Sequence, residues 1–341
     1  MFLVVEPDVV KWQNDIMNYF LPSFITINNV NRVINFYQQV LCDTAQKIIC
    51  DASQLKFIDP TGFGLLAALC YKLQARGISI ELINVPTHFK AYLAKMSLFK
   101  TYGIEDFKEN GSRFNPQNVV ELLCIQERLD VDDCSYKLAE AIVGKVPGVD
   151  KNAPPDEMTG YTPYDKITIP LRYIFSELLE NSLTHGKRHN YRDTKVWVAL
   201  QYEPAKDLIR LATVDNGCGF LKSLYREKLT EHIEAINLAL EPRVTCNGDF
   251  YLRGANKSVN QGVGLSVVKE IVTTTPGKFY LASGDALFKV KPNASISKIM
   301  SYWQGVIIAL DLKTDDLKEI NLPYIINSIT NIGSDLTLQF E

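Results

Sequence analysis

The sequence predicts an α/β protein with two domains, each built from a sheet and the helices that pack on it. The chain has 341 residues, enough for about two domains of ordinary size. Along both halves, apolar runs typical of strands alternate with segments of helical periodicity. A polar stretch with glycine and proline at residues 108–118 separates the halves. We therefore expect one domain at residues 1–110, a linker at 111–118 and a second domain at 119–341.

In the first half, the apolar pattern predicts a series of alternating elements. Strands are expected at residues 48–51 and 55–58, a long helix at 62–76, a strand at 78–85 and a helix at 87–96. Strands and helices that alternate at this spacing favour a mixed sheet with helices packed against it.

The loop before the long helix reads Asp59-Pro60-Thr61-Gly62. Thr is favoured at a helix N-terminus and Asp-Pro is common in turns, so an ordinary capped helix accounts for these residues. A phosphate on Thr61 would also be favoured there, because a helix N-terminus attracts negative charge. The residues alone leave both interpretations open.

The second half is predicted to start with a strand at residues 119–125 and a helix at 132–146. Residues 147–165 are rich in Pro, Gly and Asp and are expected to form an exposed insertion. Residues 167–185 repeat apolar side chains every three or four positions, which predicts a helix with Thr168 as its candidate cap. Further strands are expected at residues 195–202, 208–214, 278–282 and 305–311. We expect the tail at residues 321–341 to add an edge hairpin or to contact the first domain.

The helix at residues 167–185 carries Glu177 and Asn181 four positions apart, and hence on one face. A carboxylate can act as general base toward a water or hydroxyl near a phosphate. An amide oxygen one turn away can bind Mg²⁺, which prefers oxygen ligands. The same residue types are also ordinary on a solvated helix face.

Two glycine-containing motifs follow in order. Asp215-Asn-Gly217-Cys-Gly219 ends a predicted strand, and such a sequence by itself indicates a tight turn. Gly262-Val-Gly264-Leu265 leads into an apolar-periodic helix, whose free N–H groups form a natural anion site. This motif lacks the Gly-Lys-Ser/Thr of a P-loop and the third glycine of a dinucleotide fingerprint.

The order of the three motifs resembles the nucleotide pocket of the GHKL ATPases, which include the ATPase component of DNA gyrase and the anti-sigma serine kinases. The resemblance implies a Bergerat-type two-layer α/β sandwich that binds ATP and Mg²⁺. It implies that Glu177 is the catalytic base, that Asn181 binds magnesium and that Asp215 accepts a hydrogen bond from the adenine amine. Gly217, Gly219, Gly262, Gly264 and Leu265 would complete the nucleotide site.

The resemblance also predicts an ATP lid at residues 220–260. Arg253 and Lys257 are cations that could reach a γ-phosphate from it, although an exposed loop cation explains each equally simply. In one respect the sequence departs from the family pattern. Val306 follows Gly305, where many GHKL sequences have Thr.

The loop around Thr61 resembles the signature loop of STAS domains, the fold of the anti-sigma-factor antagonists. In that family an acidic residue precedes a Ser or Thr that a partner kinase phosphorylates, and Thr61 stands at that position. The resemblance implies a STAS-like fold for residues 1–110 and a docking surface for a protein partner. Pro60 stands where the family usually has Ser.

Composition argues against several other classes of protein. The net charge is −3 and the sequence pI is about 5.9, which disfavours nucleic-acid binding. No apolar run has the length of a membrane span, and the start lacks a basic signal-peptide region, so a cytoplasmic location is expected. The seven cysteines contain no Cys-x-x-Cys pair and are expected to be reduced thiols.

Two functions remain open from the sequence. The first is an ATP-binding regulatory protein, a serine/threonine kinase-like switch of the anti-sigma type in which Glu177 deprotonates the acceptor hydroxyl of a STAS module. The second is an ATP-gated conformational ATPase whose STAS half docks a protein partner without phosphotransfer. The enzyme class would be a protein kinase or an ATPase accordingly, and a homodimer is compatible with either. A sensor histidine kinase is disfavoured because no histidine lies between His88 and the second domain.

Overall fold

The N-terminal domain contains a small parallel sheet with helices on one face. In this computed structural model, the described residues are 16–96, 119–224, 227–242, 244, 262–290 and 293–331. Strands β1 (Ile16–Phe20), β3 (Lys47–Asp51) and β5 (Ser79–Ile83) lie in the order β1-β3-β5. β2 (Phe24–Ile25) and β4 (Phe57–Ile58) form a separate parallel pair. The helices are α1 (Val30–Cys42), α2 (Pro60–Ala75) and α3 (Thr87–Lys95).

The C-terminal domain contains an antiparallel sheet in the order β6-β7-β8-β10-β9. Its strands are β6 (Val119–Ile125), β7 (Val196–Glu203), β8 (Leu208–Asp215), β9 (Lys278–Val290) and β10 (Ala294–Lys313). Its helices are α5 (Val131–Val143), α6 (Pro163–His185), α7 (Gly219–Ser223), α8 (His232–Ala239), α9 (Gly264–Thr273), α10 (Thr314–Lys318) and α11 (Leu322–Asn331). The pattern of strands and helices confirms the predicted α/β class.

Several predictions concern residues outside the described ranges. These include the linker 111–118 and the lid cations Arg253 and Lys257. The described part of the predicted lid contains α7 and α8, and α8 packs against β9. Among the described helices, none is long and apolar enough to cross a membrane.

Helix α6 begins four residues earlier than the apolar pattern predicts. Thr162, and not Thr168, is its N-cap: the Thr162 hydroxyl accepts from the Asp165 N–H at 3.1 Å, and the Asp165 carboxylate accepts from the Thr162 N–H at 3.0 Å. This reciprocal capping box satisfies two N–H groups that the helix would otherwise leave free. Pro170 consequently lies inside the helix and not in its first turn.

The expectation for the tail was wrong over its described part. Residues 322–331 form helix α11, which packs against α9 of its own domain. Leu322, Ile325 and Ile329 are buried on one side of this helix. Their spacing of three and four residues is the signature of an amphipathic helix and could have been recognised in the sequence.

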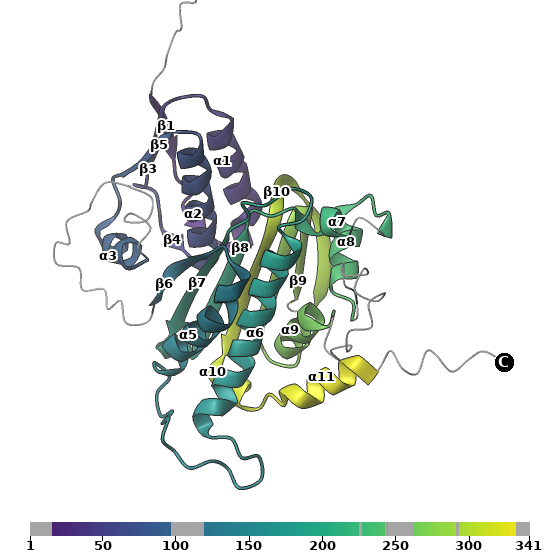
Figure 1. Ribbon diagram of the computed structural model, residues 1–341. Coiled ribbons are helices and arrows are strands. Elements are labelled where there is room, and N and C mark those ends of the chain that lie inside the picture. Colours follow the sequence, from purple (N-terminus) through teal and green to yellow (C-terminus); the bar gives the residue numbers. More distant parts are fainter. Residues whose placement is uncertain are drawn as a thin grey trace, which may run out of the picture.

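The two domains stack in four layers, as Figure 1 shows. The layers are the small sheet, helices α1 and α2, the larger sheet, and helices α5, α6 and α9. The side chains of the larger sheet alternate between its faces. One face packs against α5, α6 and α9 through Val, Leu and Ile side chains such as Val198, Leu211 and Ile308. The other packs against α1 and α2 and is rich in alanine. Its buried residues are Trp197, Ala199, Ala212, Val214, Ala282, Trp303, Ile307 and Ala309.

Helix α2 is therefore enclosed on all sides. Every residue from 60 to 70 is buried, because the helix packs against α1, against β5 of the small sheet, and against β7 and β8 of the larger sheet. A helix that is apolar all round is one that is buried all round. The helix approaches the larger sheet closely at Gly64, where a Cβ atom would lie 2.6 Å from Cγ2 of Val214.

We predict that Gly64→Leu destabilises the whole chain. Leu favours helix more than Gly does, so any loss of stability must come from forcing α2 away from the sheets that enclose it. Overpacking of this kind lowers the free energy of unfolding by about 1–3 kcal/mol, which urea denaturation measures. Ala75→Leu, on the exposed last turn of α2, is the matched control and should be nearly neutral. Equal stability of the two variants would contradict the packing described here.

Candidate functional site

Helix α6 carries a line of polar side chains toward the start of α9. Tyr173, Glu177, Asn181 and His185 follow one another at four-residue steps and so lie on one face of the helix. All four are partly buried. Glu177 and Asn181 were predicted from the sequence, whereas Tyr173 and His185 were not. Their spacing was the signal that could have identified them.

The first and third motifs meet at Glu177. Gly264 is the first residue of α9, and a Cβ atom on it would lie 1.7 Å from Oε2 of Glu177. No residue other than glycine can therefore occupy this position while Glu177 keeps its place. The Glu177 carboxylate consequently lies beside the N-terminus of α9, where free N–H groups favour an anion such as a phosphate.

The environment of Glu177 suits a general base. Burial raises its pKa to about 7, and the nearby charge of Glu180 adds to this effect, while the neighbouring Tyr173 hydroxyl acts in the opposite direction. A base with a pKa near the working pH exists in both protonation states and can accept and return a proton. Glu180 itself forms a salt bridge with Arg128 at 3.6 Å and is partly exposed.

Asp215, at the end of β8, is held by three hydrogen-bond donors. Its Oδ1 accepts from the N–H of Gly217 at 2.9 Å and of Val306 at 3.1 Å, and its Oδ2 accepts from the Ser182 hydroxyl at 2.9 Å. The side chain is only 1% exposed, and burial raises its pKa to about 6 in spite of these donors. Each carboxylate oxygen can accept about two hydrogen bonds, so Oδ2 can accept one more, for example from an amino group.

Ser182 and Val306 complete the support of Asp215, and neither was expected to do so. Ser182 follows Asn181 on α6, so one helix positions both Asn181 and the carboxylate of Asp215. Val306 contributes its backbone N–H, which any residue except proline supplies. The replacement of the usual Thr by Val306 therefore leaves this contact intact.

The glycines of the second motif allow close backbone contacts. A Cβ atom on Gly217 would lie 2.7 Å from Cα of Gly186, at the end of α6. Gly219 has φ +72° and a Cβ atom on it would lie 2.4 Å from the Gln304 carbonyl oxygen. Both positions thus require glycine, and at both the turn after β8 packs closely against neighbouring backbone.

The remaining residues of the third motif have different environments. Gly262 has φ +82°, a conformation that glycine adopts without strain. Leu265 is 7% exposed and belongs to the hydrophobic core around α6 and α9. Its side chain packs the helix and does not form part of the polar surface.

Three buried polar atoms at or next to this site lack a hydrogen-bond partner among the described residues, namely the Tyr173 hydroxyl, Nδ1 of His185 and Oγ1 of Thr184. Burial and the charges of Arg188 and Arg128 lower the pKa of His185 to about 4, so its imidazole is neutral at pH 7. Unsatisfied buried polar groups are rare and often mark a ligand site. Together with the open lone pair of Asp215 and the N-terminus of α9, they fit a nucleotide that offers amino and phosphate groups. The amide oxygen of Asn181 fits a magnesium ligand.

The loop of the N-terminal domain lies on the opposite face of the larger sheet. Asp59, not Thr61, is the N-cap of α2, and its carboxylate accepts from the N–H groups of Gly62 at 2.9 Å and Ile27 at 3.1 Å. Thr61 is in the first turn of α2 and only 1% exposed. Because α2 and α6 pack on opposite faces of the sheet, Thr61 and Glu177 do not share a site.

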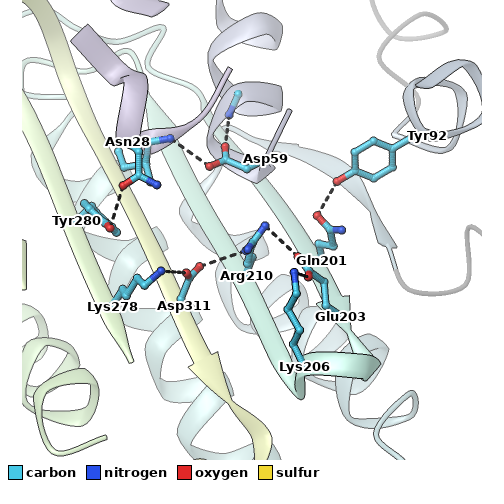
Figure 2. Close-up of polar contacts among 12 residues, drawn as sticks. Asn28, Asp59, Tyr92, Gln201, Glu203, Lys206, Arg210, Lys278, Tyr280 and Asp311 are labelled. Carbon is cyan, nitrogen blue, oxygen red and sulfur yellow. Dashed lines mark hydrogen bonds and ion pairs between the residues drawn. The ribbon is translucent and has the colours of Figure 1, made fainter. Parts of the chain in front are cut away.

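Charged side chains of the larger sheet lie beneath this loop, as Figure 2 shows. Arg210 pairs with Glu203 at 2.9 Å and with Asp311 at 3.6 Å, and its guanidinium lies 5.7 Å from the ring centre of Phe57. Burial raises the pKa of Asp59 to about 6, and the hydrogen bonds from Gly62 and Ile27 and the charge of Arg210 limit this rise. The loop thus packs over Arg210, whose charge is already paired with two carboxylates of the larger sheet.

Comparisons with known families agree with this division of the chain. Residues 167–296 match the family described as histidine kinase-, DNA gyrase B- and HSP90-like ATPase, HATPase_c. Residues 9–109 match the STAS domain. No curated protein and no solved structure matches the chain.

The HATPase_c match begins within α6 and includes Glu177, Asn181, Asp215 and the start of α9. The STAS match includes α1, α2 and the Asp59–Thr61 loop. Both resemblances inferred from the motifs are thereby confirmed. The chain combines a STAS domain and a GHKL-type HATPase_c domain in a single polypeptide.

Proposed function

We propose that this protein is an ATP-binding regulatory switch, in which the nucleotide state of the GHKL domain controls the docked STAS domain. The observation that carries the proposal is the arrangement around α6. This helix presents Glu177 to the start of α9 and, through Ser182, supports the Asp215 carboxylate. The STAS domain packs on the reverse face of the same sheet.

Each residue has a distinct task in the proposed reaction. Oδ2 of Asp215 accepts a hydrogen bond from the amino group of adenine, and the N–H groups at the start of α9 bind phosphate. Asn181 provides an oxygen ligand for Mg²⁺, which would neutralise phosphate charge. Glu177 would take the proton of the water or hydroxyl whose oxygen forms a bond to the γ-phosphorus, while the bond from that phosphorus to the β-phosphate oxygen breaks and ADP leaves.

Burial of the STAS loop favours conformational control over phosphotransfer within one chain. Thr61 is 1% exposed and belongs to a helix that is enclosed by two sheets. A hydroxyl acceptor must come within hydrogen-bond reach of the base. In the docked arrangement, the sheet separates Thr61 from Glu177, so water is the acceptor that can reach Glu177.

A second function, phosphorylation of Thr61, is supported by the presence of both family domains in one chain. Thr61 lies in the first turn of α2, where the helix N-terminus favours a phosphate. The reaction would require the loop to leave the sheet, either within the chain or toward another copy.

We predict that Asp215→Asn weakens ATP binding about tenfold or more. The change removes a buried charged acceptor, a loss of about 1.5–3 kcal/mol. Isothermal titration calorimetry with Mg²⁺ measures the affinity. Asp193→Asn, an exposed carboxylate in the loop before β7, is the charge-matched control and should bind as the parent does. Equal affinity in the two variants would refute the assignment of the adenine site.

We predict that Glu177→Gln retains ATP binding and loses about 10²–10⁴-fold in turnover, the usual contribution of a general base. Glu157→Gln, an exposed carboxylate in the loop before α6, is the charge-matched control. The base form of Glu177 predominates above its pKa of about 7, so the parent turnover should rise with pH through about 7. The Glu177→Gln variant should lose that dependence. Turnover at the parent rate in this variant would show that Glu177 is not the general base.

Labelled ATP distinguishes the two functions. We expect the label to be released as phosphate and to be absent from Thr61 in the docked chain, because this hydroxyl is buried. Peptide mass spectrometry after incubation with Mg²⁺ and ATP locates any phosphate, and Thr61→Ala serves as the control. Phosphate on Thr61 would instead establish the kinase function. Mixing Glu177→Gln and Thr61→Ala chains would then show whether transfer occurs between copies.

A further inference from the structure

Strand β10 contacts Asp215 twice, on either side of an irregularity. The indole N–H of Trp303 donates to the Asp215 carbonyl oxygen at 3.0 Å, and the N–H of Val306 donates to the carboxylate at 3.1 Å. Between them the register of β10 against β9 shifts. Gly305 allows the approach, because a Cβ atom on it would lie 2.0 Å from the Asp215 carbonyl oxygen. Bulges of this kind are common beside functional sites, where they redirect side chains.

The same segment of β10 is held from the other side by helix α1 of the STAS domain. The Asn31 side chain accepts from the Ser301 N–H at 2.9 Å, and the Gln38 amide donates to the Tyr302 carbonyl at 2.7 Å. The ring of Tyr37 packs edge-on against Trp303, with ring centres 5.0 Å apart. Trp303 is 3% exposed, so its position depends on these neighbours.

We propose that α1 of the STAS domain positions the Asp215 carboxylate through residues 301–306 of β10, with Trp303 as the positioning residue. This inference rests on the proposed function, in which Asp215 recognises adenine. A shift of α1 moves the segment, and the segment holds Asp215 by both its backbone and its carboxylate. By thermodynamic reciprocity, a nucleotide that fixes Asp215 must stabilise the docked position of α1 by the same factor.

The test removes the contacts of α1 without touching the site. The double variant Asn31→Ala/Gln38→Ala deletes the two hydrogen bonds to β10, and both side chains are only partly buried. Asn28→Ala/Tyr92→Phe is the matched control. It deletes two other hydrogen bonds between the domains, Asn28 with Tyr280 at 3.1 Å and Tyr92 with Gln201 at 2.9 Å, neither of which involves β10.

We expect the α1 variant to bind ATP about threefold to tenfold more weakly, which lies within the range found for residues that modulate coupling. It should also discriminate less between ATP and GTP, since the orientation of Asp215 sets the choice of base. The control should retain the parental affinity and discrimination. Trp303→Phe should reproduce the α1 effect, and Tyr37→Phe, which keeps the ring contact, should not.

Non-additivity provides the second measurement. Once Trp303→Phe has removed the donor to Asp215, the α1 variant should lower ATP affinity no further, because both changes act on one segment. Hydrogen exchange of residues 301–306 should slow when a non-hydrolysable ATP analogue binds to the parent and should slow less in the α1 variant.

The outcomes separate this inference from the proposed function. If the parent fails to bind ATP, both are wrong. If the parent binds ATP and the α1 variant matches its control in affinity and base discrimination, the proposed function stands and the coupling through β10 is wrong. Equal weakening in both double variants would also overturn it, because general loosening of the domain interface would then explain the effect.

Discussion

The enclosure of α2 between two sheets is the constraint on which the arrangement of both domains depends. Space for the helix comes from the alanines on one face of the larger sheet and from Gly64, which lets α2 approach Val214. Interiors are close-packed, so these small residues fix the distance between the sheets. One continuous core then contains residues of both domains, and the STAS helices replace solvent on the back of the nucleotide-binding sheet.

The two carboxylates of the candidate site differ in environment although both are buried. Asp215 receives three hydrogen bonds, which favour its charged form and keep its pKa near 6. Burial and the charge of Glu180 raise the pKa of Glu177 to about 7. Three donors hold Asp215 as an acceptor, whereas Glu177 lies beside a like charge and the N-terminus of α9. Two acids in such different surroundings can divide recognition from proton transfer.

Much of the site could be predicted from the sequence because its requirements are local. Helical spacing aligns Glu177 with Asn181, and the glycines mark places where the backbone comes close to another group. The same reasoning could have found His185, one turn beyond Asn181. The cap of α6 was misplaced because the apolar pattern starts later than the capping box of Thr162 and Asp165.

Docking of the domains could not be predicted in this way. The contacts of Asn31 with Ser301 and of Tyr37 with Trp303 join residues that lie far apart in the chain, so no local pattern encodes them. One signal was nevertheless present. Residues 63–70 are apolar on every side of a helix, which is too short to span a membrane and must therefore be covered by protein on all sides.

The enclosure of α2 also has a consequence during synthesis. The helix ends at Ala75, while the strands that cover its outer side begin only at Val196. The ribosome adds about 5–20 residues per second, so the strands that cover this side of α2 are synthesised on the order of ten seconds or more after the helix. During that time the apolar side of α2 is uncovered. The N-terminal domain emerges first but completes its core only when β10 closes over it. The nascent chain therefore passes through a stage with an exposed apolar helix, the kind of surface that chaperones bind.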